Sequence, residues 1–199
     1  MVVSLLALLL AGTPVPEPGN AIRDAAVVVR GGAWAGSGVV WDVSARLVLT
    51  ALHVVEEMPP AGIEVVGHDG VSFRARVIDS EPLLDLALLK VEGALAGGFL
   101  PLGLGTALAP GDAIALAVCP KARCVRGVGR VLMAVRRFAG SRYLAIAGEA
   151  RPGASGGAVL DARGAIVGIV DLTLGWEPGV ALAIPIERAA ERFPRASSR

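Results

Sequence analysis

The 199-residue sequence has few aromatic residues, few histidines and no marked excess of either charge. Lys and Arg number 19 and Asp and Glu 18, so the net charge is +1 and the basic field that a nucleic-acid binder needs is missing. Charged residues make up 19% and hydrophobic ones 54%, which excludes a disordered chain. Aromatics make up only 4%, so aliphatic side chains must fill the core. The chain length fits one domain or a tight pair of subdomains, and we expect no nucleic-acid partner.

The apolar run at the N-terminus is too short for a membrane-spanning helix, which needs about 20 residues. It extends from Val2 to Gly12 without a charge and suits the core of a secretory signal peptide, although no Lys or Arg precedes it. A buried first strand, or a start codon assigned in the wrong place, is the alternative. We expect residues 1–20 to be a signal peptide and Pro-rich spacer, the protein to be secreted or periplasmic, and no stable membrane insertion.

Glycine and proline are plentiful, with 26 and 13 residues, and they separate short apolar runs. Such runs between turn residues are typical of the strands of a β-barrel or sandwich. We therefore predict an all-β fold whose twelve strands cover residues 25–30, 38–41, 46–50, 63–66, 72–78, 85–91, 113–118, 125–135, 143–147, 158–160, 165–170 and 180–184. Only residues 186–193 have helical spacing, and residues 92–110 are predicted to connect two six-stranded halves.

Only two histidines are present, so a general base has few candidates. His53 follows an apolar strand, where a lone histidine is more often structural than catalytic, and His68 lies in a Gly-His-Asp-Gly turn. Ser155 lies in the glycine-flanked segment GASGG of residues 153–157. A tight turn there would push the hydroxyl forward and direct backbone N–H groups at a substrate carbonyl. A Gly-rich hairpin with a solvated serine is the alternative.

The order of these residues along the chain separates the families of serine enzymes. The pattern G-x-S-x-G also marks the nucleophile turn of α/β-hydrolases, but their histidine follows the serine, and no histidine follows Ser155. A subtilisin-like order would need Asp24 or Asp42 before His53, and the alternating helices of that fold are not predicted. The order histidine, acid, serine stays open.

The acid of such a triad must lie between His53 and Ser155. The aspartates in this interval are Asp69, Asp79, Asp85 and Asp112. Asp85 opens a nearly all-apolar strand, where a carboxylate is costly unless it is hydrogen-bonded, and a histidine N–H is a suitable partner. Because the other positions suit ordinary turns, we predict that Asp85 is the acid.

Short motifs from about residue 25 to residue 193 occur in the order and spacing of a known family. They are GSGVV (36–40), LTALHVV (49–55), DLALLKV (85–91), LG with GD (102–103 and 111–112), GASGG (153–157), residues 164–170 and AIPI (183–186). Together they resemble the chymotrypsin-like serine proteases, most closely the bacterial trypsin-like and HtrA-like peptidases. Ala154 departs from the Asn or Asp common in the family, and we expect altered turn stability rather than lost activity. About six residues follow Phe193, so we expect none of the PDZ modules that HtrA proteins usually carry.

The resemblance implies two packed six-stranded antiparallel β-barrels with the active site in the cleft between them. The protease domain would cover residues 21–199, with the first barrel at about 21–95, the second at about 107–185 and a short C-terminal helix at about 186–193. His53 and Asp85 would come from the first barrel and Ser155 from the second.

The resemblance also implies hydrolysis of peptide bonds through an acyl-enzyme intermediate. Ser155 would attack the carbonyl, His53 would transfer its proton and Asp85 would orient His53. Backbone N–H groups of Gly153 and Ser155 would form the oxyanion hole. We expect polypeptide substrates and neither metal nor cofactor, while the oligomeric state stays open. The alternative function is a catalytically silent binding protein of the same fold, which would have no reason to retain all three residues.

The two cysteines, Cys119 and Cys124, lie five positions apart in one loop. In an exported protein this spacing predicts a small disulfide-closed turn, whereas a cytoplasmic location would leave two thiols. No histidine is near them, so a four-ligand zinc site cannot form there.

Glu149 is a candidate residue for the pocket that selects the substrate side chain. In the family the floor of the primary pocket is built partly by the residue six positions before the nucleophile, which here is Glu149. A carboxylate there would bind an Arg or Lys side chain of the substrate. The alternative is that Glu149 faces solvent or pairs with Arg151, with small aliphatic side chains preferred, as in HtrA-like relatives.

Overall fold

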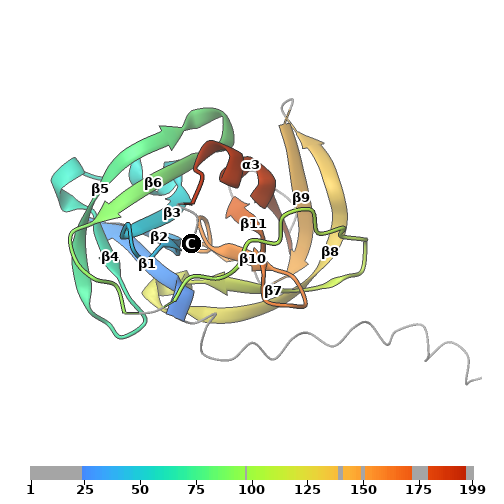
Figure 1. The fold of residues 1–199 in the computed structure, drawn as a ribbon, viewed down its shortest axis with the longest axis horizontal. Coiled ribbons are helices and arrows are strands. Elements are labelled where there is room, and N and C mark those ends of the chain that lie inside the picture. Colours follow the sequence, from blue (N-terminus) through green and yellow to red (C-terminus); the bar gives the residue numbers. More distant parts are fainter. Residues whose placement is uncertain (1–23, 97, 139–140, 149–150, 172–178, 196–199) are drawn as a thin grey trace, which may run out of the picture.

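The computed structural model describes residues 24–96, 98–138, 141–148, 151–171 and 179–195. The predicted signal peptide and Glu149 lie outside the described residues. In the described part, twelve strands form two closed six-stranded antiparallel barrels that lie side by side, the first coloured blue to green and the second yellow to orange in Figure 1. This arrangement confirms the all-β double-barrel fold implied by the resemblance. Among the same residues, no helix has the length and apolar character needed to cross a membrane.

The first barrel has the strand order β1-β2-β3-β6-β5-β4 and closes through pairing of β1 with β4. Its strands are β1 (Ala26–Gly31), β2 (Trp34–Asp42), β3 (Leu47–Ala51), β4 (Glu64–Val66), β5 (Ser72–Glu81) and β6 (Leu86–Val91). Three short helical segments lie between them: α2 (Leu52–Val55) and the 3-10 turns η2 (Pro60–Gly62) and η3 (Pro82–Leu84).

The second barrel has the strand order β10-β11-β12-β9-β8-β7 and closes through pairing of β7 with β10. Its strands are β7 (Ala113–Val118), β8 (Val125–Phe138), β9 (Ser141–Gly148), β10 (Ala158–Leu160), β11 (Ile166–Asp171) and β12 (Val180–Pro185). The 3-10 turn η4 (Pro120–Ala122) follows β7, and helix α3 (Ile186–Arg192) follows β12.

Alternation of side chains along the strands builds three apolar cores. In β1, Val27 and Val29 fill the first barrel, while Val28 belongs to a cluster shared with the second barrel. In β7, Leu116 fills the second barrel in the same way, and Ala117 joins the shared cluster. Since successive strand residues point to opposite faces, β1 and β7 each contribute both to their own barrel and to the junction. The junction between the barrels is therefore a continuous apolar core.

Several strands begin or end at other residues than the sequence predicted. β2 begins at Trp34 rather than residue 38, because Gly36 and Ser37 continue the pairing with β1 although they break the apolar pattern. β5 extends to Glu81 for the same reason, since its polar end pairs with β6. The strand predicted from residue 85 begins at Leu86, because Asp85 has a left-handed backbone (φ 52°, ψ 44°). The one-turn helix α2 was not predicted.

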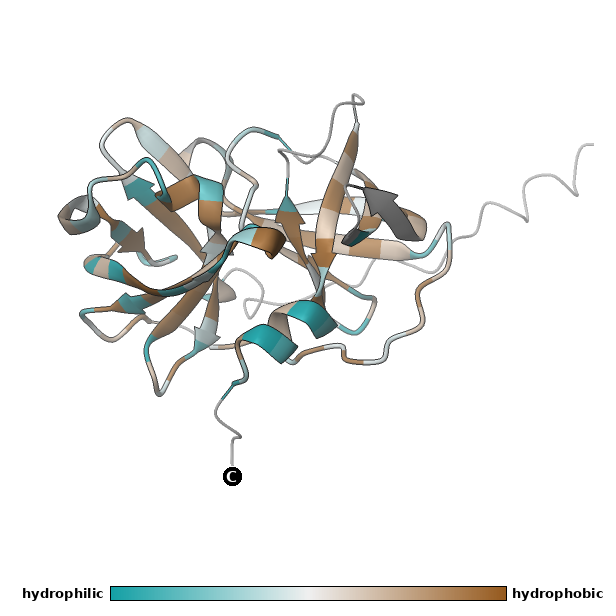
Figure 2. Cartoon of the chain, turned by 90° about the horizontal axis from the view of Figure 1, so that it is seen from above, coloured by the Kyte–Doolittle hydropathy of each residue, from teal (hydrophilic) through white to brown (hydrophobic). Residues whose placement is uncertain are grey.

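Helix α3 joins the two barrels. It packs on β11 and β12 of the second barrel, and Figure 2 shows it largely hydrophilic, in contrast to the mostly hydrophobic strands. Just beyond its end, the carbonyl of Phe193 accepts a 2.9 Å hydrogen bond from the indole N–H of Trp41 in β2. Arg195 stacks on the same indole, 4.4 Å from the ring centre, and burial lowers its pKa to about 10. The C-terminal segment therefore fixes one barrel against the other.

Candidate active site

His53 lies in α2, directly after the buried strand β3. The strand brings the chain to the barrel junction, and the first residue of α2 is held there because the N–H of Leu52 donates to the carbonyl of Asp85 at 2.9 Å. The imidazole remains partly accessible, with 25% of its side chain exposed. His53 is therefore both anchored by its backbone and open to a ligand.

Asp85 holds His53 through two hydrogen bonds. One carboxylate oxygen accepts the backbone N–H of His53 at 2.9 Å, and the other lies 2.5 Å from Nδ1 of the ring. The left-handed backbone of Asp85 ends η3 and aims the side chain at α2, a conformation that aspartate tolerates better than most residues. With its proton on Nδ1, the ring presents Nε2 as the proton acceptor.

The other aspartates considered from the sequence lie elsewhere. Asp69 accepts the N–H of Val71 in its own turn, and Asp112 accepts that of Ala109. Asp79 binds Arg192. The second histidine, His68, lies in the β4–β5 turn with Nε2 3.4 Å from a carboxylate oxygen of Asp24. Of the four candidate acids, Asp85 is the one that the structure pairs with His53.

The Ser155 turn has glycines where the backbone requires them. Gly153 and Gly156 have φ values of 93° and 85°, and the turn is closed by a 3.0 Å hydrogen bond from Gly157 N to Ala154 O. Any side chain at Gly156 would collide with the carbonyl of Ser37 and the hydroxyl of Thr50. The turn is thus packed against the end of β3, close in sequence to His53.

Ser37 ties the two barrels together behind this turn, a role that the sequence did not reveal. Its fully buried hydroxyl donates to the carbonyl of Gly153 at 2.6 Å and accepts the N–H of Cys119 at 2.7 Å. Its backbone N–H donates to the carbonyl of Ser155 at 2.9 Å. Only its place in the GSGVV motif distinguished it, because its partners are more than 80 positions away.

The predicted disulfide between Cys119 and Cys124 is present. It closes the loop that contains η4, directly after β7. Cys119 is buried in the core shared by the barrels, and its N–H is the one bound by Ser37. The disulfide therefore stabilises a loop that supports the serine turn from behind.

Asp171, at the end of β11, adds a second carboxylate near His53, this one buried, and the sequence analysis missed it. Ligand-type atoms of His53, Asp85 and Asp171 all lie within 4.8 Å of one another. The 2.5 Å contact between Nδ1 and Asp85 is a hydrogen bond, which suits proton transfer through the ring. Burial lowers the pKa of the His53 imidazole, but the hydrogen bond and charge of Asp85, with the charges of Asp171 and Glu56, outweigh burial and hold that pKa above its ordinary value of 6.5.

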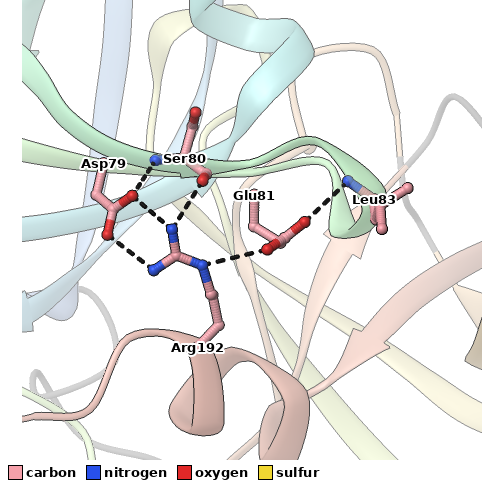
Figure 3. Close-up of polar contacts among 5 residues, drawn as sticks. All are labelled: Asp79, Ser80, Glu81, Leu83 and Arg192. Atoms are coloured by element: carbon pink, nitrogen blue, oxygen red, sulfur yellow. Dashed lines mark hydrogen bonds and ion pairs between the residues drawn. The ribbon is translucent and has the colours of Figure 1, made fainter.

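Arg192 fixes the segment that leads to Asp85, as Figure 3 shows. Its guanidinium binds both carboxylate oxygens of Asp79, the carbonyl of Ser80 at 3.0 Å and the carboxylate of Glu81 at 3.2 Å. The other oxygen of Glu81 accepts the N–H of Leu83 in η3, the turn that ends at Asp85. Helix α3 thus supports the acid from the opposite end of the chain.

These features define a double-barrel protein with a histidine–carboxylate pair directly after β3 and a glycine-rich serine turn packed against the end of the same strand. The model of the trypsin-like peptidase domain family matches residues 36–169, and the chain belongs to this family.

Similar proteins are named as proteases. The chain is 32% identical over 166 residues to the putative serine protease HhoA of Synechocystis, covering 77% of this chain and 41% of that protein. It is 26% identical over 166 residues to the periplasmic serine endoprotease DegP of Salmonella typhimurium, covering 75% and 33%. It is 29% identical over 165 residues to the periplasmic pH-dependent serine endoprotease DegQ of Escherichia coli, covering 77% and 35%. The matches therefore span well under half the length of these relatives.

Proposed function

We propose that this protein is a serine endopeptidase that hydrolyses peptide bonds with His53, Asp85 and Ser155. Ser155 Oγ attacks the scissile carbonyl while Nε2 of His53 removes its proton, giving a tetrahedral intermediate. Its collapse expels the leaving amine, which takes the proton from His53, and leaves an acyl-enzyme that water hydrolyses by the same route. Backbone N–H groups of Gly153 and Ser155 stabilise the oxyanion.

The observation that carries this proposal is the double hydrogen bond between Asp85 and His53. A carboxylate that binds both the backbone and Nδ1 of a histidine fixes the ring orientation and its tautomer, and it stabilises the imidazolium formed during proton transfer. The serine turn packs against β3, which leads directly into α2. A silent binding protein has no need for this pairing.

A fluorophosphonate probe, which phosphonylates activated serines, distinguishes an enzyme from a silent binder. We expect labelling of the wild-type protein and none of Ser155→Ala, because Ser155 is the proposed nucleophile. Ser72→Ala, which removes an exposed hydroxyl on β5, is the matched control and should label like wild type. Folded wild-type protein that remains unlabelled across pH 6 to 9 would favour the binding protein.

Ser37→Ala is expected to lower both stability and turnover. It leaves the buried N–H of Cys119 and the carbonyl of Gly153 without their partner, at a cost of about 1–3 kcal/mol in the free energy of unfolding. The loosened turn should reduce kcat by about tenfold, because the oxyanion donors belong to it. Urea denaturation and steady-state kinetics measure the two effects.

Ser72→Ala is again the control, since loss of an exposed hydroxyl changes stability by less than about 0.5 kcal/mol. If Ser37→Ala unfolds at the same urea concentration as Ser72→Ala and retains full kcat, Ser37 does not hold the turn.

We also infer that the protein functions in an oxidising compartment outside the cytoplasm. Disulfides persist in such compartments, and the similar DegP and DegQ are both named periplasmic. Protein isolated from its source cells and treated with iodoacetamide should gain no carbamidomethyl group before reduction and two afterwards. Modification of Cys119 and Cys124 without reduction would place the protein in a reducing compartment instead.

A further inference from the structure

Asp171 lies where both barrels meet the serine turn. It is the last residue of β11 and is only 1% exposed. The preceding residue, Val170, exchanges hydrogen bonds with the turn: Gly156 N donates to its carbonyl at 2.9 Å, and its N–H donates to Gly157 O at 2.8 Å. The backbone position of Asp171 is therefore fixed relative to Ser155.

The side chain of Asp171 faces the histidine–carboxylate pair. Its carboxylate lies within 4.8 Å of the nearest ligand-type atoms of both His53 and Asp85. Asp85 is more exposed, at 24% of its side chain, so Asp171 is the better shielded of the two carboxylates. A charge in such a position is screened little by solvent and acts strongly on a neighbouring imidazole.

The proposed mechanism uses one carboxylate, yet this site holds two beside one histidine. Negative charge near His53 comes from three elements: Asp85 before β6, Asp171 at the end of β11 and Glu56 after α2. Glu56 is exposed, so its effect is screened. Asp85 also forms hydrogen bonds with His53. Asp171 is therefore the buried charge whose contribution has no part in the three-residue mechanism.

We propose that Asp171 is a second positioning carboxylate, which stays ionised beside Asp85 and stabilises the positively charged form of His53. The role of Asp171 in catalysis rests on the proposed peptidase function, whereas its effect on the charge of His53 does not. The imidazolium that forms when Ser155 loses its proton is then balanced by two carboxylates, the half-buried Asp85 and the buried Asp171. In exchange, neutral His53, the form that accepts the proton, requires a higher pH than it would beside one carboxylate.

The test is the titration of the imidazoles by NMR in the inactive Ser155→Ala background. The chain has only two histidines, so His68 serves as an internal reference. Asp171→Asn keeps the size of the side chain and removes its charge. We expect the pKa of His53 to fall by about one unit, the usual effect of losing an opposite charge at this separation.

Asp161→Asn is the matched control. Asp161 is also almost completely buried, but it lies in the turn before β11, roughly 20 Å from the far end of that strand. Its substitution should leave the pKa of His53 within about 0.2 units of wild type. If Asp171→Asn does not fold, Asp171→Ser provides a smaller neutral side chain with the same expected shift.

Two outcomes separate this inference from the proposed function. In protein that retains Ser155, the acid limb of the kcat/KM profile should move to lower pH by the same amount in Asp171→Asn. A folded Asp171 variant with a His53 pKa within about 0.3 units of wild type overturns the inference, even when the protein is active. A full pKa shift in the Ser155→Ala background, together with no peptide hydrolysis by the protein that retains Ser155, supports the second carboxylate and refutes the peptidase function.

Discussion

Replacing His53 with alanine is expected to lower kcat/KM for a peptide substrate by about 10⁴- to 10⁶-fold. In the proposed mechanism the imidazole is the general base for Ser155, and the other histidine of the chain, His68, lies in the β4–β5 turn beside Asp24. Residual hydrolysis would come from the oxyanion hole and substrate binding. Hydrolysis of a fluorogenic peptide library, assayed with enough enzyme to detect slow turnover, measures the loss.

The fold should survive this substitution, because the His53 side chain is partly exposed and lies outside the three apolar cores. Thermal unfolding followed by circular dichroism tests that expectation. His68→Ala is the control and should keep wild-type turnover. Near-wild-type kcat/KM in folded His53→Ala would overturn the whole mechanism.

Asp85→Asn is expected to reduce kcat by about 10⁴-fold. The amide can still accept the backbone N–H of His53, but its NH₂ group faces Nδ1 and favours the tautomer with the proton on Nε2. His53 then cannot accept the proton of Ser155. Asparagine is the informative substitution, because it also tolerates the left-handed backbone at this position, whereas alanine would add strain.

Asp79→Asn is the control that shows whether loss of any carboxylate on this segment lowers kcat, or only loss of the one that binds His53. Asp79 lies on the same segment and binds Arg192, not His53. We expect less than a tenfold change in kcat for this control. A similarly small change in Asp85→Asn would mean that a different group orients His53.

The sequence identified most strands because each contains a short apolar run between glycine- or proline-containing turns. Strand ends were missed where polar residues continue a ladder. Gly36 and Ser37 pair with β1, and Ser80 pairs with Ala87 in β6, although none of them follows the apolar pattern. In such places pairing is decided by the neighbouring strand, which a local pattern does not contain.

The candidate triad was accessible from the sequence because chain order and residue type restrict it strongly, with only two histidines and a single glycine-flanked serine in the expected order. Ser37, Asp171 and Arg192 were not found, because their roles depend on distant partners. Ser37 bonds to Gly153 across 116 positions, and Arg192 bonds to Asp79 across 113. No local signal predicts such contacts, and they appear only when both barrels are in place.

The contact between Arg192 and the segment of Asp79 and Glu81 has a consequence for biosynthesis. All six strands of the first barrel are complete by Val91, about a hundred residues before the ribosome adds Arg192. A nascent first barrel can therefore close, but the turn that presents Asp85 lacks its guanidinium clamp until α3 has been translated and has docked. The turn at Asp85 therefore gains this support only after the six strands of the second barrel have been translated, so the full bracing of the first barrel depends on completion of the second.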